Sequence, residues 1–390
     1  MHRSRRAPVR TLLASATLAG LAAAAVVAAP LAAGAQTKAA PQGISNAVFV
    51  QSNATSGNQI LAYARSAGGT LAFVHAYDTG GRGARAAGAI VEPLASQGSL
   101  YYDPTGALLI AVNAGSNTIT TFHVNGDTLS DAAVLQAGRF PVSVTSHGSL
   151  VYVLDGGGSG AVRGFTEANR ALTPIAGSRR GLGLDPTATP QYLNTPGQVG
   201  FSPDGSQLIV TTKDNGSNID VFGVKADGKL TAAPWKNAAA EPVPFGFVFD
   251  PDGRLVVTEA GGADVSTYGL DSDGSISHVS TVADGEAAPC WIASVGGWYF
   301  VANAGSADIS GYQVSSGGVA SLIAANGGIA GTTDGGPTDL AGSSNGQYLY
   351  VDAGGAGAVD EFAINSDGTL TSLGSITGLS GTGIEGIVAS

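Results

Sequence analysis

Seven copies of one short pattern run along this chain. The stretch AVNAGSNTITTF at residues 111–122 has a close counterpart in VANAGSADISGY at residues 301–312. In each copy a β-branched residue is followed three positions later by an aromatic one. The seven pairs are Ile60 and Tyr63, Ile119 and Phe122, Val162 and Phe165, Ile219 and Phe222, Val265 and Tyr268, Ile309 and Tyr312, and Val359 and Phe362. Such repeats are typical of folds built from stacked units, because one unit cannot bury its hydrophobic faces alone.

Each copy carries the signals of four β-strands. A β-prone run precedes the pair, as in LLIAV at 108–112, and a further apolar residue follows after a turn rich in Gly and Asp. Six copies begin with an additional short strand and a tight turn, such as Ser202-Pro203-Asp204-Gly205. The apolar residues near the start of the last strand are Leu71, Leu129, Leu172, Leu230, Ile276, Val319 and Leu370. The unit is therefore strand, turn, strand, loop, strand, turn, strand, at intervals of 43–59 residues.

This unit predicts an all-β protein. Charged residues are only 12% of the chain, Gly contributes 59 of 390 residues, and no segment after the N-terminal region keeps a helical period for three turns. Four antiparallel strands per repeat match one blade of a β-propeller. We therefore predict a single seven-bladed propeller over residues 44–390. The alternative, an open array of β-sandwiches, does not explain the constant four-strand unit.

The two ends of the repeat region predict how the ring closes. The first copy starts at Asn46 with its second strand and lacks the inner strand. The last residues, 383–390, resemble inner strands such as 197–201. We expect this C-terminal strand to pair inside blade one, which leaves no open interface between blades. Deletion of the last eight residues should then destabilise the fold far more than trimming residues 36–43.

The N-terminal region has the pattern of a secretory signal. Residues 1–10 contain four Arg and no acid, residues 11–29 are mostly Ala, Leu, Val and Gly, and Ala33-Gly34-Ala35 resembles a cleavage site. We expect a signal peptide at 1–35, a linker at 36–43, and a secreted protein without a membrane contact after cleavage. A permanent membrane anchor is the alternative. Ser4-Arg5-Arg6 also leaves open whether export uses a twin-arginine signal.

The charge of the remaining chain limits its partners. Beyond residue 35 there are 14 basic and 29 acidic residues, a net charge of −15. Nucleic acid is therefore not an expected partner.

Cys290 has no second cysteine to pair with, and we expect it to be buried as a small hydrophobic residue. No metal-ligand spacing and no cofactor motif is present, so we expect no metal or cofactor. We also expect the protein to be a monomer.

The blade pattern resembles the lactonase-type seven-bladed propellers. The resemblance lies in an inner strand, a PDG turn as at 203–205, a YLYV-type strand as at 348–351, the β-branched and aromatic pair, and a DG turn before the last strand. These proteins include the 6-phosphogluconolactonase-like and carboxymuconate-cyclase-like propellers and overlap with YVTN-repeat propellers. The resemblance covers roughly residues 44–390 and concerns architecture more than activity.

The resemblance also implies where a lactonase site would lie. Hydrolytic members carry, at one mouth of the channel, an Arg-His pair, a further His, an Arg after a middle strand and a Glu on a middle strand. Glu259 matches the Glu and is our candidate catalytic residue. The other positions hold Pro244-Phe245-Gly246, Pro196-Gly197-Gln198 and Asn303-Ala304 instead. The resemblance therefore implies a degenerate lactonase site.

Further polar residues are candidates for ligand binding. Several occur at the register of Glu259, near the end of the second strand, and the long connection at 173–197 carries an Arg pair. The candidates are Arg139, Asp155, Arg179, Arg180, Gln198, Lys213, Asn303 and Asp352. The alternative is that these side chains only cap strand ends or lie in a solvated loop.

Two functions remain open from the sequence. The first is a secreted propeller that binds a sugar lactone, a glycan or a cell-surface protein through a degenerate lactonase site. The second is an exported lactone hydrolase that uses Glu259 together with Arg179, Arg180, Lys213 or Arg139. An enzyme for acidic lactones needs a cationic group beside Glu259 to hold the substrate anion.

Overall fold

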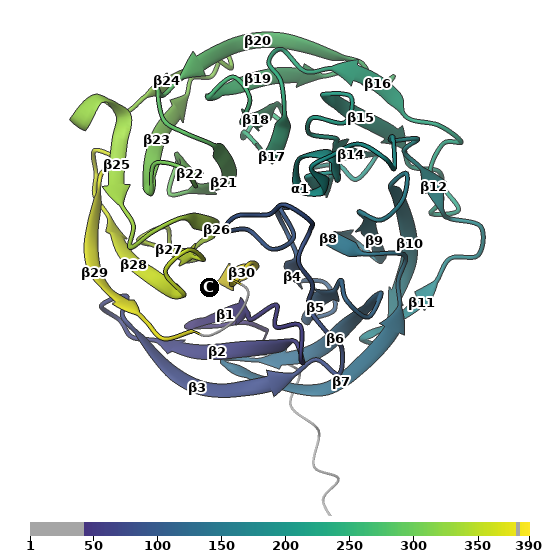
Figure 1. Ribbon diagram of the computed structural model, residues 1–390, viewed down its shortest axis with the longest axis horizontal. Coiled ribbons are helices and arrows are strands. Elements are labelled where there is room, and N and C mark those ends of the chain that lie inside the picture. The colour runs from purple at the N-terminus through teal and green to yellow at the C-terminus, as the bar shows by residue number, and fades with distance from the viewer. Residues whose placement is uncertain (1–42, 380–382) are drawn as a thin grey trace, which may run out of the picture. The chain divides into compact units, whose positions relative to one another are not determined.

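Seven antiparallel sheets follow one another around a central axis in the computed structural model, which describes residues 43–379 and 383–390 (Figure 1). This confirms the predicted seven-bladed propeller with four antiparallel strands per blade. The signal peptide expected at 1–35 and all but the last residue of the linker expected at 36–43 lie outside the described residues. Within the described residues, no helix is long and apolar enough to cross a membrane.

The first four blades contain the following strands, given with the strand nearest the axis first. Blade one has β30 (Ile387–Ala389), β1 (Ala47–Gln51), β2 (Gln59–Arg65) and β3 (Leu71–Asp78). Blade two has β4 (Leu100–Asp103), β5 (Leu108–Asn113), β6 (Thr118–Asn125) and β7 (Thr128–Gln136). Blade three has β8 (Pro141–His147), β9 (Leu150–Asp155), β10 (Ala161–Ala168) and β11 (Ala171–Pro174). Blade four has β13 (Gln198–Phe201), β14 (Gln207–Thr211), β15 (Asn218–Gly223) and β16 (Trp235–Ala238).

The last three blades repeat the arrangement. Blade five has β17 (Pro244–Phe249), β18 (Leu255–Glu259), β19 (Asp264–Leu270) and β20 (Ile276–Ala283). Blade six has β21 (Pro289–Val295), β22 (Trp298–Asn303), β23 (Asp308–Val314) and β24 (Ala320–Leu322). Blade seven has β26 (Pro337–Gly342), β27 (Tyr348–Ala353), β28 (Ala358–Ile364) and β29 (Leu370–Ile376).

The C-terminal strand closes the ring as expected. β30 pairs antiparallel with β1, with Phe49 opposite Val388. Ser390 extends this contact, because its amide donates a hydrogen bond of 3.0 Å to the carbonyl oxygen of Ala47. Its carbonyl oxygen also accepts one of 2.9 Å from Nε of Arg65. The first and last strands of the described residues therefore form one blade, and β1 is paired on both of its sides.

The burial pattern explains why the sequence repeats as it does. The second strand of a blade is covered on both faces by neighbouring blades, and every residue of β5 is buried. The fourth strand faces outwards, and in β7 only Leu129 is buried. The aromatic residues of the seven pairs are at most 3% exposed. The repeated phrase therefore encodes packing between blades.

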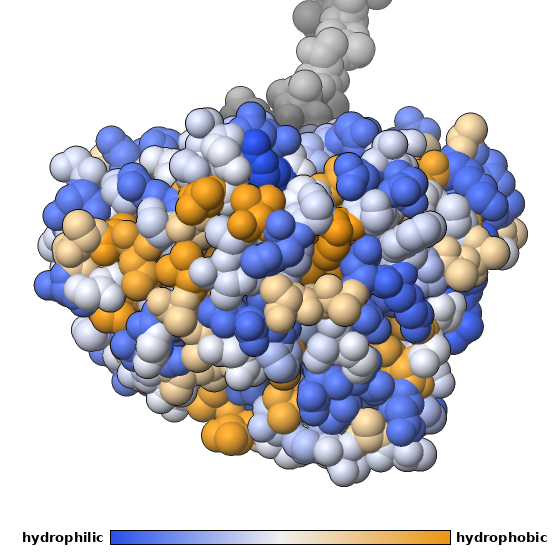
Figure 2. Space-filling view, turned by 90° about the horizontal axis from the view of Figure 1, so that it is seen from above, coloured by the Kyte–Doolittle hydropathy of each residue, from blue (hydrophilic) through white to orange (hydrophobic). Residues whose placement is uncertain are grey.

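The outer surface is chemically mixed. Figure 2 shows the side of the ring as hydrophobic residues interspersed with hydrophilic ones. Large hydrophobic residues exposed on outer strands include Phe73, Val134 and Val279. Such scattered apolar residues are normal on a protein surface and do not mark a contact site.

Three connections depart from the simple repeat. The long connection between blades three and four contains β12 (Arg180–Gly181), which pairs with β10, and the short helix α1 (Gln191–Asn194). The connection between blades six and seven contains the 3₁₀ turn η1 (Ala325–Gly328) and β25 (Ile329–Thr332), which pairs with β23. In blade four, Leu230 forms an isolated bridge with Val224, and the fourth strand begins only at Trp235.

Candidate functional site

A segment between blades one and two crosses the central channel. Residues 94–98, here called the strap, belong to the connection between β3 and β4, which lies across the middle of the ring (Figure 1). The amides of Leu94, Ala95 and Ser96 donate hydrogen bonds of 2.6, 3.3 and 2.8 Å to the carboxyl group of Glu385. Because Glu385 lies two residues before the closing strand β30, the strap is fixed to the junction of the ring.

The strap is also fixed to blades on the other side of the channel. Nε1 of Trp291 donates a hydrogen bond of 2.8 Å to the carbonyl oxygen of Ser96. The side-chain amide of Gln97 forms two hydrogen bonds with the backbone of Ile292, as a neighbouring strand would. The backbone amide of Gln97 donates a hydrogen bond of 2.9 Å to the carbonyl oxygen of Gly197. These contacts with blade six and with Gly197, just before the first strand of blade four, hold the strap across the axis.

Lys213 contributes to the same network. Its Nζ is fully buried and donates to the carbonyl oxygen of Ala95 at 2.6 Å, to Oγ1 of Thr195 at 3.0 Å and to the carbonyl oxygen of Tyr192. Burial lowers the pKa of Lys213 to about 8, against the opposing effect of Glu385. This predicted ligand residue therefore joins the strap to the α1 connection, and all three of its N–H groups are engaged.

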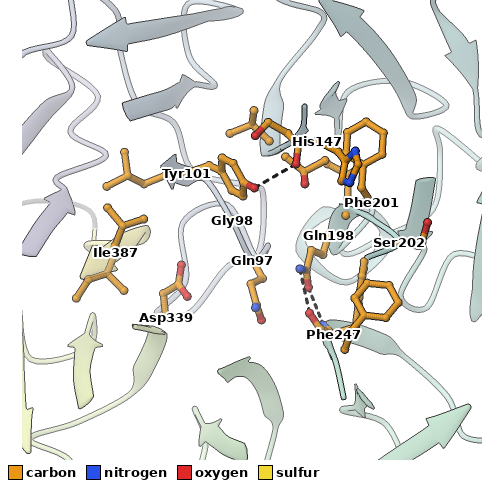
Figure 3. Close-up of a pocket in the computed structure, with 18 of the residues that line it drawn as sticks. Gln97, Gly98, Tyr101, His147, Gln198, Phe201, Ser202, Phe247, Asp339 and Ile387 are labelled. Carbon is orange, nitrogen blue, oxygen red and sulfur yellow. Dashed lines mark hydrogen bonds between the residues drawn. The ribbon is translucent and has the colours of Figure 1, made fainter. Parts of the chain in front are cut away.

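Two cavities lie on opposite sides of the strap. The first, here called the Asp339 cavity, has a volume of about 400 Å³. It is lined by Gln97, Gly98 and residues of the inner strands (Figure 3). The second, here called the Glu92 cavity, has a volume of about 510 Å³. It is lined by residues 90–92, by Tyr192 and Leu193, and in blades five and six by the start of the inner strand and the loop after the second strand. Both volumes are in the range of small-molecule sites.

The Asp339 cavity combines aromatic rings with polar groups. Its aromatic residues are Tyr101, Phe201, Phe247 and Phe249, and its polar ones include Gln97, Ser146, His147, Gln198 and Asp339. None of the described residues that line it is Lys or Arg. The cavity therefore offers apolar faces and hydrogen-bonding groups, but no positive charge from Lys or Arg for an anionic ligand.

Asp339 is the buried carboxyl group of this cavity. It is 4% exposed, and Oδ1 accepts a hydrogen bond of 2.9 Å from the amide of Leu340. Burial raises the pKa of Asp339 to about 8. Asp352, its partner across the β26–β27 pair, is fully buried, and burial together with Asp339 and Glu385 raises the pKa of Asp352 well above its usual value. At neutral pH Asp339 is therefore mainly protonated and can donate a hydrogen bond as well as accept one.

Gln198 is the predicted ligand residue that lies in this cavity. Its Oε1 accepts a hydrogen bond of 2.6 Å from the amide of Phe247, and its Nε2 donates one of 3.1 Å to the carbonyl oxygen of the same residue (Figure 3). The side chain thereby links the inner strands of blades four and five. Its amide is therefore engaged mainly by the protein.

Glu259 lies at the end of β18 and lines neither cavity. It is fully buried, and its carboxyl group accepts hydrogen bonds from Oγ of Ser266 at 2.5 Å and from the hydroxyl group of Tyr268. Burial raises the pKa of Glu259, while these two donors and the amides of residues 240 and 241 act in the opposite direction. None of these groups is a cation, so the Arg that an acidic lactone needs is not among them.

Asn303 has surroundings of the same kind. Its Nδ2 donates to Oδ1 of Asp308 and to Oγ of Ser310, both at 2.8 Å. The partners of Glu259 and Asn303 thus come from the third strand of their own blades. Polar residues at this register stabilise the loop between the second and third strands.

The remaining candidates gather at blade three, away from the strap. Asp155 lies 4.0 Å from Nε of Arg163, and burial raises the pKa of Asp155 to about 7 while Arg163 and Arg179 oppose this. The Arg180 guanidinium donates to the backbone carbonyls of Leu230 and Thr231 in blade four. Arg139 lines a separate surface hollow together with residues 185–189. The structure therefore does not bring these residues together with Glu259 or Lys213.

Sequence reasoning missed the strap, Asp339 and Glu385. One signal was present, because the largest interval between copies, 59 residues, separates the first two pairs and contains the strap. The carboxyl groups gave no comparable signal. An acid in a short inner strand looks like any polar residue until its neighbours in space are known.

Comparison with known proteins places the fold. No family model and no curated protein matches the sequence. A protein from Bacteroides fragilis with the provisional name 6-phosphogluconolactonase has a TM-score of 0.64 and 18% identity, covering 87% of this chain and 96% of its own. The periplasmic gluconolactonase of Pseudomonas aeruginosa also has a TM-score of 0.64, with 16% identity and coverage of 87% and 98%. Virginiamycin B lyase from Staphylococcus aureus is less similar, with a TM-score of 0.51, 11% identity and coverage of 74% and 86%.

These similarities confirm the lactonase-like propeller fold that the repeat pattern indicated. At such low identity they establish the architecture alone.

Proposed function

We propose that this protein binds a neutral sugar or sugar lactone in the Asp339 cavity and has lost the cationic groups of a lactonase site. The observation that carries the proposal is the lining of the cavity. Aromatic rings and a carboxyl group with a raised pKa lie on the axis of the ring, and no Lys or Arg is among the described residues around them.

The rings suit the apolar side of a sugar. Phe247 and Phe249 pack edge to face with their centroids 5.9 Å apart, and both line the cavity. Tyr101 lies on another wall, with its hydroxyl group bonded to the carbonyl oxygen of Ser146 at 3.3 Å (Figure 3). A pyranose ring presents C–H groups to such aromatic surfaces, while its hydroxyl groups need a few polar partners.

Asp339 supplies a polar partner without a charge. As a protonated acid at neutral pH it donates one hydrogen bond and accepts others, which matches a sugar hydroxyl. A phosphate or carboxylate would lose its hydration in this cavity and gain no Arg or Lys in return. The proposal therefore favours neutral ligands over phosphorylated or carboxylated lactones.

The predicted export signal fits the same proposal. A protein secreted after cleavage near Ala35 would meet glycans and sugar lactones outside the cell. A cell-surface protein that binds the outer surface of the ring is the alternative partner, and the hydrolysis of a lactone with Glu259 is the alternative activity.

One experiment separates these functions. Purified protein is titrated by calorimetry with neutral, phosphorylated and carboxylated sugar lactones and with neutral oligosaccharides, and hydrolysis is followed in parallel. We expect neutral ligands to bind without turnover, and Phe249→Ala to weaken binding by about tenfold, since one aromatic contact is lost. Glu259→Gln is the control and should bind as the wild type does.

Other results would reject the proposal. If no neutral sugar or lactone binds, the cavity has another role. Turnover that disappears in Glu259→Gln would establish the hydrolase instead. Tight binding of phosphorylated lactones alone would contradict the argument from charge.

A further inference from the structure

We infer that the Glu92 cavity is a second small-molecule site, which takes an apolar molecule carrying a protonated amine. This site is independent of the proposed sugar site, because it lies on the other side of the strap. Its lining shares no residue with that of the Asp339 cavity.

The walls of the Glu92 cavity are mostly apolar. They combine large side chains with small residues that leave space between the loops of blades five and six. The lining residues are Ile90, Val91, Glu92, Tyr192, Leu193, Val243, Phe245, Ala260, Gly261, Ala288, Cys290, Ala304 and Gly305. A volume of about 510 Å³ with such walls favours a ligand with an aromatic or aliphatic body.

The rim of the cavity carries an exposed aliphatic side chain. Ile90 lines the cavity and is 76% exposed. An apolar ligand in the cavity would cover part of this surface and gain the free energy of removing it from water.

Glu92 gives the cavity its charge preference. Its carboxylate is partly exposed, and Oε2 accepts a hydrogen bond of 3.2 Å from the amide of the adjacent Val91. A carboxylate has lone pairs for several further donors, which an ammonium group can supply. The Cys290 thiol remains neutral, because burial and the nearby Glu92 raise the pKa of Cys290.

The cationic side chains near the cavity, those of Lys213 and Arg85, are engaged by groups of the protein and are not placed to bind an anionic ligand. Lys213 Nζ lies behind the ring of Phe245, 5.2 Å from its centroid, and is bound to Ala95, Tyr192 and Thr195. Arg85, on the same connection as Glu92, donates to the carbonyl oxygens of Ala89 and Ile90. The accessible charge of the lining is therefore negative.

The test uses three probes with the same phenyl body. 2-Phenylethylamine, 2-phenylethanol and phenylacetate are titrated into the protein at pH 7, and affinity is measured by calorimetry or by ligand-observed NMR. We expect the amine to bind more tightly than the alcohol, and the acid to bind most weakly. Glu92→Gln should weaken amine binding by about tenfold or more and leave alcohol binding nearly unchanged, because a charge-assisted hydrogen bond is lost.

Two further variants locate the site. Ala304→Leu should weaken amine and alcohol alike by filling the cavity, provided that thermal unfolding shows an intact fold. Phe249→Ala, in the Asp339 cavity, should leave amine binding unchanged. Equal affinity for amine and alcohol, an unaffected Glu92→Gln variant, or no binding of any probe would overturn the inference. A failed sugar titration would not, because the two cavities are probed by different ligands and variants.

Discussion

The amide nitrogen of Ser96 donates a hydrogen bond of 2.8 Å to Oε1 of Glu385, a residue 289 positions later in the chain. This contact joins the strap to the segment that completes blade one. The strap therefore depends on the closure of the ring, and the Asp339 cavity, which Gln97 and Gly98 line, depends on the strap.

Replacement of Glu385 should test this dependence. Glu385→Ala leaves the amides of Leu94, Ala95 and Ser96 without their acceptor. We expect the free energy of unfolding to fall by about 3 kcal/mol, since buried donors without partners are costly. Urea unfolding measures the change. Glu241→Ala, at an exposed position, is the control and should stay within about 0.5 kcal/mol of the wild type. Equal stability of the two variants would show that the strap does not need Glu385.

Lys213 should also be required to hold the strap in place. Lys213→Met keeps the length of the side chain but removes all three hydrogen bonds of Nζ. The expected loss of stability is roughly 2–4 kcal/mol, because the gain from removing a buried charge only partly offsets the unpaired acceptors. The exposed Lys225→Met provides the comparison.

A second readout of Lys213→Met distinguishes a local effect from general loss of stability. Trp291 donates to the strap at Ser96, so loosening of the strap should change tryptophan fluorescence under native conditions. A native spectrum identical to that of the wild type would mean that Lys213 does not hold the strap.

Stability should depend on pH through the buried carboxyl groups. Burial raises the pKa of Asp339 and of Glu385 to about 8, so the native state keeps these protons between pH 5 and 8 while the unfolded chain releases them. Stability therefore falls as pH rises through this window, with a slope of up to ~1.4 kcal/mol per pH unit for each group. Lys213, whose pKa is lowered to about 8, acts oppositely above pH 8, because there the unfolded state binds more protons.

Thermal unfolding between pH 5 and 10 checks this expectation. The midpoint should decline towards pH 8, and Asp339→Asn should make the decline shallower. Asp367→Asn should leave it unchanged, because hydrogen bonds from Thr369 lower the pKa of that exposed carboxyl group. A midpoint that rises from pH 5 to 8 would contradict the role given to the buried acids.

Removal of residues 383–390 should disrupt the ring. The deletion removes β30, the carboxyl group of Glu385 and the buried side chains of Ile384 and Ile387. The two isoleucines alone correspond to about 3–6 kcal/mol of hydrophobic burial. A chain without residues 1–42 is the comparison, and its unfolding midpoint should be close to that of the full chain. Comparable midpoints for the two truncations would argue against closure by β30.

The sequence was most informative where structure is local and repeated. Pairs such as Ile119 and Phe122 lie in one strand, and seven copies reveal the blade even though each copy is weak. Closure by residues 383–390 followed from the same pattern, because an absent inner strand at one end matched a surplus strand at the other.

The candidate site was harder to predict because its contacts are distant in sequence. Lys213 was expected to face a ligand, yet its partners come from the connections at residues 95, 192 and 195. Those connections lie outside the repeat, so no periodicity indicates where they fold. The raised pKa of Asp339 likewise depends on burial, which a sequence does not display.

Closure by β30 also has a consequence for biosynthesis. Strands β4 to β29 pair within blades whose four strands follow one another in the chain, so these six blades can form in order as the polypeptide emerges from the ribosome. Blade one cannot, because its inner strand includes residue 389. Until residues 385–389 are synthesised, β1 remains an unpaired edge facing the channel and the strap lacks Glu385. The nascent protein is therefore an open arc, available to chaperones, and becomes a ring only after residues 387–389 have been synthesised.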